Sequence, residues 1–545
     1  MGWDRIAATV AGRRSWLPGL GAVLLGIGFM VLIGGNPAAG TAPLSVPANS
    51  DSAMVDALAR QFSGGDQLPL ILVVSRIDDA ALDSADVNAA NAAHDRMRAL
   101  PTPAQPAAAI PMTVSADGKA AIGVVPISAN MSGLHLNDTV AALRTAAGKG
   151  LPEGLVAHVT GGPAFGADIA NAFTDANVTL LAVTASVVAL LLMATYRSPV
   201  LWLIPLLVIG FADRVSTSVS TAVASLTGLS FDGATSGITS VLVFGAGTNY
   251  ALLLISRYRQ ELRSHAEHRE ALRCAVRMAG PAILASNATV VLALLTLVFA
   301  STPSTRSLGA LAAGGLVVAA ASVLLVLPPL LAVCGRRLFW PFIPHRADGA
   351  ALDSGAWRRV AEGVARRPAL VAAVAIAALA VLATGLIGTR IGLTQTEQFR
   401  VRADSVSGYD IVAAHFPAGL TNPTLIVTPA AQAPQVEQAI SATPGVVSVT
   451  ESGRATIGST NWSKWSVVID APPSSNQAFT TIAALRHSMP TRSPEALVGG
   501  PDAQALDVRD AATHDRVLLI PAILAVILIV LYALLRSVLA PPTLL

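Results

Sequence analysis

The hydrophobic positions of the chain are gathered into long runs, and two long polar segments separate these runs. A transmembrane helix needs about 20 apolar residues in succession, and eight runs approach that length. The pattern therefore predicts a polytopic α-helical membrane protein with spans TM1 to TM8. The predicted spans lie near residues 16–33, 178–196, 200–226, 235–255, 281–300, 308–333, 369–387 and 517–535.

The polar segments have the patterns of folded α+β domains. In the first, apolar alternation predicts strands over 68–75 and 155–160 and a hairpin across Asp117-Gly118. Helical spacing predicts helices over 51–62, 87–100 and 137–147. From residue 68 onward the order is βαββαβ, which is the ferredoxin-like pattern.

These patterns divide the chain into seven parts. We expect an N-terminal segment with TM1 (1–34), a first extracytoplasmic domain (35–176), a helix block TM2–TM6 (177–335), a cytoplasmic linker (336–368), TM7 (369–389), a second extracytoplasmic domain (390–514) and TM8 with the C-terminus (515–545).

Composition and charge support a membrane protein and set its orientation. Of the 545 residues, 53% are hydrophobic and 13% are charged, against about 25% charged in soluble domains. Arginines are concentrated in 257–277 and 336–367, and short basic loops stay on the cytoplasmic side. We therefore expect a plasma-membrane protein with a cytoplasmic N-terminus. The net charge of +3 is too small to indicate a nucleic-acid partner.

The chain repeats itself at a spacing of roughly 340 to 355 residues. The repeated elements are Asp51-Ser52 with Phe62 and Asp404-Ser405 with Phe416, Thr160-Gly161-Gly162-Pro163 and Val498-Gly499-Gly500-Pro501, and Arg197-Ser198 and Arg536-Ser537. The first copy has five spans after its polar domain and the second has one. The repeat predicts a tandem duplication with an incomplete second half, lacking about four spans, and so a C-terminally truncated chain.

The segment Phe244–Leu262, FGAGTNYALLLISRYRQEL, resembles the fourth-helix motif of the MmpL (mycobacterial membrane protein large) transporters. These transporters are a branch of the resistance-nodulation-division superfamily. The segment from Asp404 to Gly419 resembles the start of that family's second external domain. The resemblance implies two porter-type external domains and export of lipids or other amphipathic molecules, driven by the proton gradient. It also implies a proton relay of Asp-Tyr pairs on the fourth and tenth helices.

The first relay pair falls on Asn249-Tyr250, where an amide replaces the carboxyl. Because an amide does not titrate, we interpret Asn249, Tyr250, Thr248 and Ser286 as a hydrogen-bonded remnant of a relay. Polar contacts between helices are the alternative interpretation.

Asp213 and Arg214 are intramembrane charges in the second run of the helix block. They would form either a displaced relay or a pair that reaches water in the outer half of its span. Adjacent helix residues do not face each other, so we expect each to have a partner elsewhere. Gly245 and Gly247 are expected to permit close helix packing.

Other functions find little support in the sequence. We find no Walker-type motif for ATP, no nucleophile–base constellation and no cofactor motif, and the His265/His268 spacing is a weak metal signal. We therefore expect no enzyme and no metal site. The predicted partners are an amphipathic cargo, the membrane, and either a second copy of the chain or a complementing C-terminal half. A non-transporting binding or assembly protein, or a relative of sterol-sensing receptors, is the alternative.

Overall fold

The computed structural model describes residues 2–34, 46–100, 111–129, 131, 133–196, 198–229, 232–341, 343, 356–388, 403–416, 423–489 and 495–535. The helices are α1 (Gly2–Ala11), α2 (Trp16–Ile33), α3 (Asp51–Ala59), α4 (Ser84–Arg98), α5 (Gly133–Gly148), α6 (Gly162–Tyr196), α7 (Leu203–Thr227), α8 (Gly233–Ser264), α9 (His268–Leu295), α10 (Pro303–Leu325), α11 (Leu327–Cys334), α12 (Ala356–Arg366), α13 (Pro368–Ala383), α14 (Asp404–His415), α15 (Ala433–Ser441), α16 (Asn476–Ser488) and α17 (Pro501–Leu535). The strands are β1 (Gln67–Arg76), β2 (Thr113–Val114), β3 (Ala120–Ser128), β4 (Leu155–Thr160), β5 (Thr424–Pro429), β6 (Val446–Ile457), β7 (Thr460–Ile469) and β8 (Leu497–Gly499).

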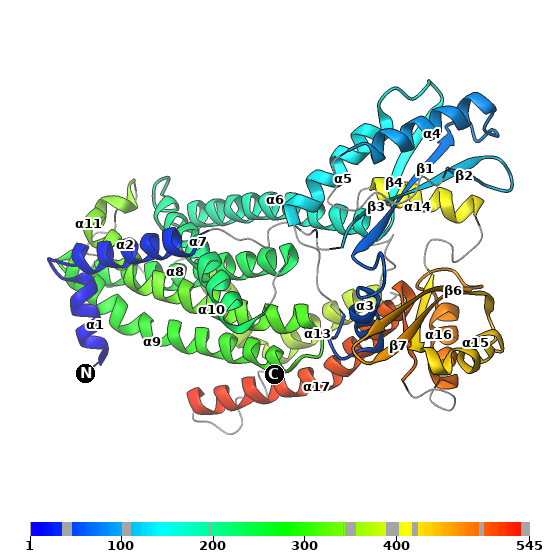
Figure 1. The fold of residues 1–545 in the computed structure, drawn as a ribbon. Helices are drawn as coiled ribbons and strands as arrows, with labels where there is room; N and C mark the ends of the chain where they lie inside the picture. The colour runs from blue at the N-terminus through cyan, green and yellow to red at the C-terminus, as the bar shows by residue number, and fades with distance from the viewer. Residues whose placement is uncertain are drawn as a thin grey trace.

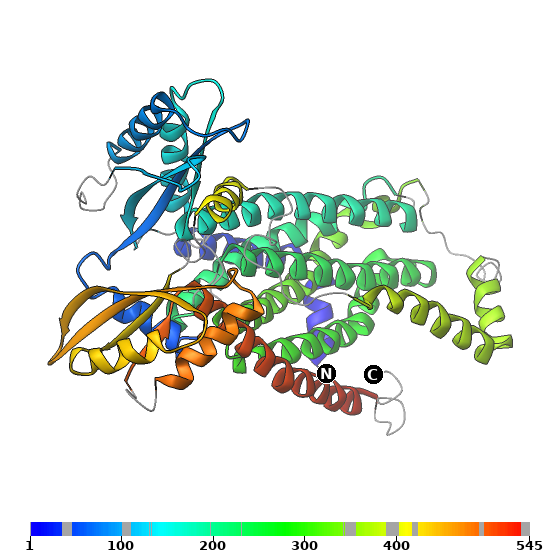
Figure 2. The same ribbon diagram turned by 90° about the vertical axis from the view of Figure 1, so that its right-hand side faces the viewer.

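A block of long apolar helices forms one end of the molecule, and two sheets with their helices form the other (Figures 1 and 2). In the block, α7, α8, α9 and α10 pack against one another, with α2 and α6 beside them. The first helix, α1, packs on α9, a contact that the sequence did not predict. Seven described helices are long and apolar enough to cross a membrane, and 179–194 of α6 form a shorter apolar stretch.

The first α/β unit consists of β1–β4 with α4 and α5. Its sheet is antiparallel with the strand order β2-β3-β1-β4, and α4 and α5 supply apolar residues to its core. The predicted βαββαβ order and the predicted hairpin are present, with Gly118 at φ 73° in the turn. A capping box of Asp83 and Asp86 begins α4, where two side chains bind otherwise unpaired backbone N–H groups.

The second α/β unit consists of β5–β8 with α15 and α16, and it repeats this topology. Its strand order is β6-β7-β5-β8, again antiparallel. Each strand therefore occupies the place of its counterpart in the first unit. The duplication that was read from short sequence matches is thus present in the strand order of both sheets.

The two halves of the chain exchange one helix. Helix α3, from the N-terminal half, packs on β5 and β8 of the second unit, where Val55 and Phe62 join Val427 in a small apolar cluster. Helix α14, from the C-terminal half, packs on β4, β1 and β3 of the first unit, where Val412 and Phe416 contact the apolar face of the sheet. Phe62 and Phe416, which the sequence paired, therefore have equivalent places in opposite units.

Two continuous helices join the units to the apolar block. Each of α6 and α17 has 35 residues, which corresponds to about 52 Å at 1.5 Å per residue. Each begins directly after the last strand of its unit and continues into an apolar stretch. The domain limits predicted at 176/177 and 514/515 fall inside these helices, so no flexible joint separates unit from span there.

The structure also refines the predicted repeat. Gly161 and Gly500 both have positive φ (103° and 97°), and a Cβ on either would meet a proline carbonyl, that of Pro69 or Pro423. These two glycines are therefore equivalent, so the predicted match of Thr160 with Val498 is wrong by one residue. Arg197, Pro417–Gly419 and 536–545, which hold other parts of the predicted matches, lie outside the described residues.

Candidate functional site

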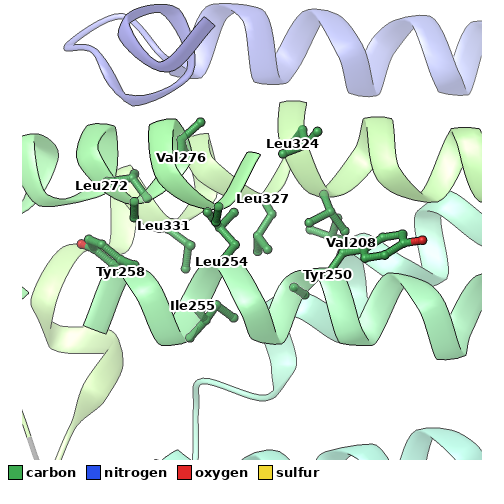
Figure 3. Packing of buried hydrophobic residues seen from close by; sticks show 14 of the residues in the cluster. Val208, Tyr250, Leu254, Ile255, Tyr258, Leu272, Val276, Leu324, Leu327 and Leu331 are labelled. Atoms are coloured by element: carbon green, nitrogen blue, oxygen red, sulfur yellow. The ribbon is translucent and has the colours of Figure 1, made fainter. Parts of the chain in front are cut away.

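The predicted polar step lies in the middle of α8, and Tyr250 is its buried member. Tyr250 is 2% exposed and donates a hydrogen bond from its hydroxyl to Asn287 Oδ1 of α9, at 3.1 Å. Its hydroxyl is also within hydrogen-bonding reach of Ser286. Figure 3 shows the Tyr250 hydroxyl directed away from the packed Leu254 and Leu327. Asn287 directly follows Ser286 in the chain, but it was not predicted to belong to this cluster.

The other two predicted members do not join this cluster. The Thr248 hydroxyl donates to the Phe244 carbonyl of its own helix, at 2.6 Å. Asn249 lies on an exposed face of α8, and no hydrogen bond joins it to Tyr250 among the described residues. The predicted four-residue cluster is therefore divided, because successive positions on a helix turn by about 100° and face different neighbours.

Gly247 and Gly245 behave differently in helix packing. A Cβ on Gly247 would lie 3.3 Å from Ile209 of α7 and 3.8 Å from Ala319 of α10, so this glycine permits a close three-helix contact. Gly245 is exposed, and a Cβ there would meet nothing within 4 Å. The expectation of close packing at Gly245 is therefore not met, because the position faces away from the other described helices.

Asp213 and Arg214 form an ion pair with each other. The Arg214 guanidinium folds back and donates from Nε and Nη2 to Asp213 Oδ2, with the Nε–Oδ2 distance 3.1 Å. The Asp213 side chain is 3% exposed and that of Arg214 is 57% exposed. The expectation that each needs a partner elsewhere is wrong, because a long arginine side chain can bend back to its neighbour even though the two Cβ atoms diverge.

A cluster of one carboxylate, one imidazole and one thiol at the C-terminal end of α8 could hold a metal ion. Glu261, His265 and Cys274 each place one ligand atom within 4.8 Å of the others. Glu261 is already bound to Arg257, with Nη2 and Oε1 2.9 Å apart. The sequence pointed to His265 without Glu261 and Cys274, because these two residues come from different helices, α8 and α9, and meet only in the fold.

The exchanged helix α14 is held on the first unit by a group of charges. Arg144 binds both oxygens of Asp168 on α6, at 2.6 and 2.8 Å, and its Nε donates to Asp404 of α14 at 2.8 Å. Asp404 also contacts His158 Nδ1 at 2.7 Å and accepts a hydrogen bond from the Val159 N–H at 3.0 Å. Burial acts to raise the pKa of Asp404, but His158, the Val159 N–H and Arg144 outweigh it and hold that pKa below its usual value.

The same arrangement holds α3 on the second unit. Arg486 binds both oxygens of Asp507 on α17, at 2.6 and 2.9 Å, and its Nε lies 3.4 Å from Asp51 of α3. The Ser52 N–H donates to Asp507 at 3.3 Å, as the Ser405 N–H donates to Asp168 at 3.2 Å. The Asp-Ser pairs that the sequence showed as repeats are thus the contact points of the exchanged helices, a role that the sequence did not reveal.

Comparisons with known proteins agree with this architecture. The model of the MMPL family matches residues 44–371 and 402–545. The membrane protein ActII-3 of Streptomyces coelicolor is 36% identical over 508 residues, which cover 91% of this chain and 69% of that protein. The apo-petrobactin exporter of Bacillus anthracis is 26% identical over 543 residues, covering 91% and 72%. A probable transport protein of Mycobacterium tuberculosis, MmpL9, is 31% identical over 318 residues, covering 58% and 32%.

The family model covers most of the chain, including both exchanged helices. The relatives whose names state an activity are transport proteins or exporters. Several apolar helices of spanning length accompany the two small antiparallel sheets. The chain therefore belongs to the MMPL family of membrane transport proteins, and it is not an enzyme.

Proposed function

We propose that this protein exports lipids or other amphipathic small molecules across the plasma membrane, driven by the proton gradient. The N-terminus and the arginine-rich ends of α8 and α9 are cytoplasmic in this proposal, and the two α/β units are extracytoplasmic. The cargo passes between the units after it leaves the membrane. The name of the petrobactin exporter supports an outward direction for a small-molecule cargo.

The observation that carries this proposal is the mechanical connection between units and spans. Each unit continues without a break into a long apolar helix, α6 or α17, and holds a helix from the other half of the chain. A tilt of α6 therefore moves the first unit directly, and the α3 and α14 contacts transmit that movement between the halves. Rigid helices that join two such units are suited to opening and closing a path between them.

Coupling to protons requires a group that binds and releases them inside the helix block. Tyr250 and Asn287 supply a buried hydrogen bond, but neither is a carboxyl group. Asn249 is exposed and is an amide. These three residues therefore do not supply a coupling carboxylate.

The experiment is efflux of a fluorescent amphipathic dye from proteoliposomes that contain the purified full chain, with and without an imposed pH gradient. We expect gradient-dependent efflux that a protonophore abolishes, and none from liposomes without protein. A Tyr250→Phe variant should lower the rate, since it removes the bond to Asn287. The exposed Arg454→Met variant is the control and should leave the rate unchanged.

Absence of gradient-dependent efflux for several amphipathic dyes would overturn the proposal. Saturable binding of a dye without efflux would then favour a non-transporting membrane binding protein, which the amide at Asn249 also favours.

A further inference from the structure

A small cavity between α7, α8 and α10 is lined almost entirely by hydroxyl groups. Seven of its eight lining residues are serine or threonine, and Leu311 is the eighth. Its α8 residues begin at Thr235 in the first turn of that helix, so the cavity lies in the half of the block nearest the α/β units. A hydroxyl-lined space is unusual among apolar helices, where polar groups are costly and mark pathways.

Two of the lining hydroxyls have no hydrogen-bond partner among the described protein atoms. They are Ser216 Oγ and Thr239 Oγ1, on residues that are 1% and 6% exposed. A buried hydroxyl without a partner costs about 1–3 kcal/mol, so both are suited to bind water. The cavity volume is about 10 Å³, which is close to the roughly 10–15 Å³ that one water molecule needs.

Asp213 lies one helical turn from this cavity. Ser216 and Thr217 follow it by three and four positions on α7, and the Thr217 hydroxyl donates to the Asp213 carbonyl at 3.0 Å. The carboxylate is almost completely buried, while its partner Arg214 is more than half exposed. When a proton binds to Asp213, the Arg214 guanidinium can therefore leave the carboxylate and contact other groups at the surface of the helix block.

The other charged side chains of the surrounding helices lie at their ends. α2 and α11 contain no Asp, Glu, Lys, Arg or His. α10 contains Arg306 in its first turn, which donates to the Ala300 carbonyl. The charged residues of α8 are Arg257, Arg259, Glu261 and Arg263, near its C-terminus, and on α6 the described Asp168 lies in the first unit. The buried carboxylate Asp232 caps the N-terminus of α8, where its Oδ1 accepts a hydrogen bond from the Thr235 N–H at 2.7 Å. Arg214 is therefore the charge that faces Asp213 among the described residues.

We propose that Asp213 and the hydroxyl-lined cavity form the proton-binding site that couples this transporter, with water in the cavity as the route from the α/β side. Proton binding converts the carboxylate to a neutral carboxyl group and breaks the ion pair with Arg214. The freed arginine changes the contacts of α7, which packs against α8 and α10. A proton suits the site better than sodium, because a cavity of about 10 Å³ has room for about one water molecule and not for a hydrated ion. This inference rests on the proposed function.

Gly315 of α10 lies beside two of the lining residues, Ser216 and Thr239. A Cβ at this position would lie 2.6 Å from Ser216 Oγ, 2.9 Å from Val243 and 3.2 Å from Thr239. Gly314 offers a matched control, since a Cβ there would meet only Val219, at 4.0 Å. The two neighbouring glycines therefore allow one methyl group to be placed in the cavity wall or away from it.

The test is labelling of Asp213 by dicyclohexylcarbodiimide, which reacts with protonated carboxyl groups in membranes, followed by peptide mass spectrometry of the full chain. We expect labelling to rise as pH falls, to decrease several-fold in Gly315→Ala and to be unchanged in Gly314→Ala. Ser216→Ala removes a hydroxyl without adding bulk and should also slow labelling, which covers the case that Gly315→Ala fails to fold. Asp213→Asn should abolish gradient-dependent efflux while dye binding remains.

Labelling of Asp213 that is independent of pH, or equal in Gly315→Ala and Gly314→Ala, would overturn the inference. Protection by sodium chloride at constant pH would replace the proton by sodium and would also overturn it. Labelling does not require transport, so a pH-dependent result together with absent efflux would contradict the proposed export and leave the proton site standing. Efflux that survives in Asp213→Asn would reject the site alone.

Discussion

The two α/β units share a strand order, an exchanged helix and an Arg–Asp–Asp group, but they fill the helix contact in opposite ways. In the first unit the helix carries Gly408, and a Cβ there would lie 3.1 Å from Thr160 on the strand. In the second unit the helix carries Val55, which packs over Gly499 on the strand. The equivalence of Gly161 with Gly500 makes Thr160 the counterpart of Gly499. The side chain that fills the contact is therefore on the strand in the first unit (Thr160) and on the helix in the second (Val55).

The units also differ in charge at this contact. His158 contacts Asp404 in the first unit, whereas the equivalent strand position in the second is Leu497, which packs in an apolar cluster. Asp404 has three partners on the first unit, and Asp51 is 40% exposed with a single, longer contact to Arg486. The two units therefore keep the same geometry, while the helix contact of the first unit depends more on ionised groups than that of the second.

Removal of the shared arginine should have the largest effect. In Arg144→Met or Arg486→Met, two carboxylates lose the charge between them; breaking a fully buried pair costs about 3–5 kcal/mol, which is an upper bound for these part-buried pairs. We expect a large fall in the thermal unfolding midpoint of the detergent-solubilised protein for both variants. Arg454→Met is the control, because that side chain is 71% exposed. A fall no larger than that of the control would show that the charges do not hold the exchanged helices.

Exchange of side-chain volume should have the next largest effect. A Cβ on Gly499 would lie 2.5 Å from the Cβ of Val55, so Gly499→Ala should cost about 1–3 kcal/mol through overpacking. Addition of Val55→Ala should restore part of the midpoint. Gly162→Ala is the control, since a Cβ there meets nothing within 4 Å. If the double variant is less stable than Gly499→Ala, Val55 is not what fills this contact.

Neutralisation of the carboxylates on α14 and α3 should destabilise the contact with the first unit more than the contact with the second. Asp404→Asn loses charged hydrogen bonds to Arg144 and His158, at a cost of about 1.5–3 kcal/mol. Asp51→Asn should cost under about 1 kcal/mol, because its contact is long and solvent-exposed. The measurement is the same thermal midpoint at neutral pH. Equal losses in the two variants would remove the difference in ionic dependence between the units.

The smallest expected effect is on pH dependence. Because the pKa of Asp404 is lowered by folding, its stabilisation is present above about pH 4, the unfolded value, and is lost as pH falls through the lower folded pKa. His158→Ala should bring that pKa nearer to its usual value, so the midpoint should fall less steeply below about pH 4. His487→Ala, in the second unit, is the control. An unchanged slope in His158→Ala would show that the histidine does not stabilise the Asp404 carboxylate.

Much of the fold was predictable because it depends on local patterns. The apolar runs predicted helices that the structure contains, and alternation with the Asp117-Gly118 turn predicted the first sheet. The span predicted over 308–333 is divided into α10 and α11 at Val326, because Pro328 and Pro329 have no backbone N–H to donate to the carbonyls of the last turn of α10. The repeat identified Asp51-Ser52 and Asp404-Ser405 as equivalent without showing their partners.

The candidate site was less predictable, because its contacts depend on which helix faces lie together. The sequence identified Tyr250 and Ser286 but placed Asn249 and Thr248 with them, and it missed Asn287. It noted Asp213 and Arg214 but not that they bind each other. The cavity near Asp213 combines hydroxyl groups from two helices and a glycine from a third, and no single stretch of the chain contains that combination.

That the chain is a membrane protein built from a duplication follows from its residue order, because hydrophobic runs and repeated motifs are properties of successive residues. Three features are visible only in the folded chain. The halves exchange α3 and α14, Arg144 and Arg486 bind carboxylates about 260 and 435 positions away in the chain, and a water-sized space lies one helical turn from Asp213. These features depend on the packing of distant helices, which fixes the distances between side chains that the linear order leaves open.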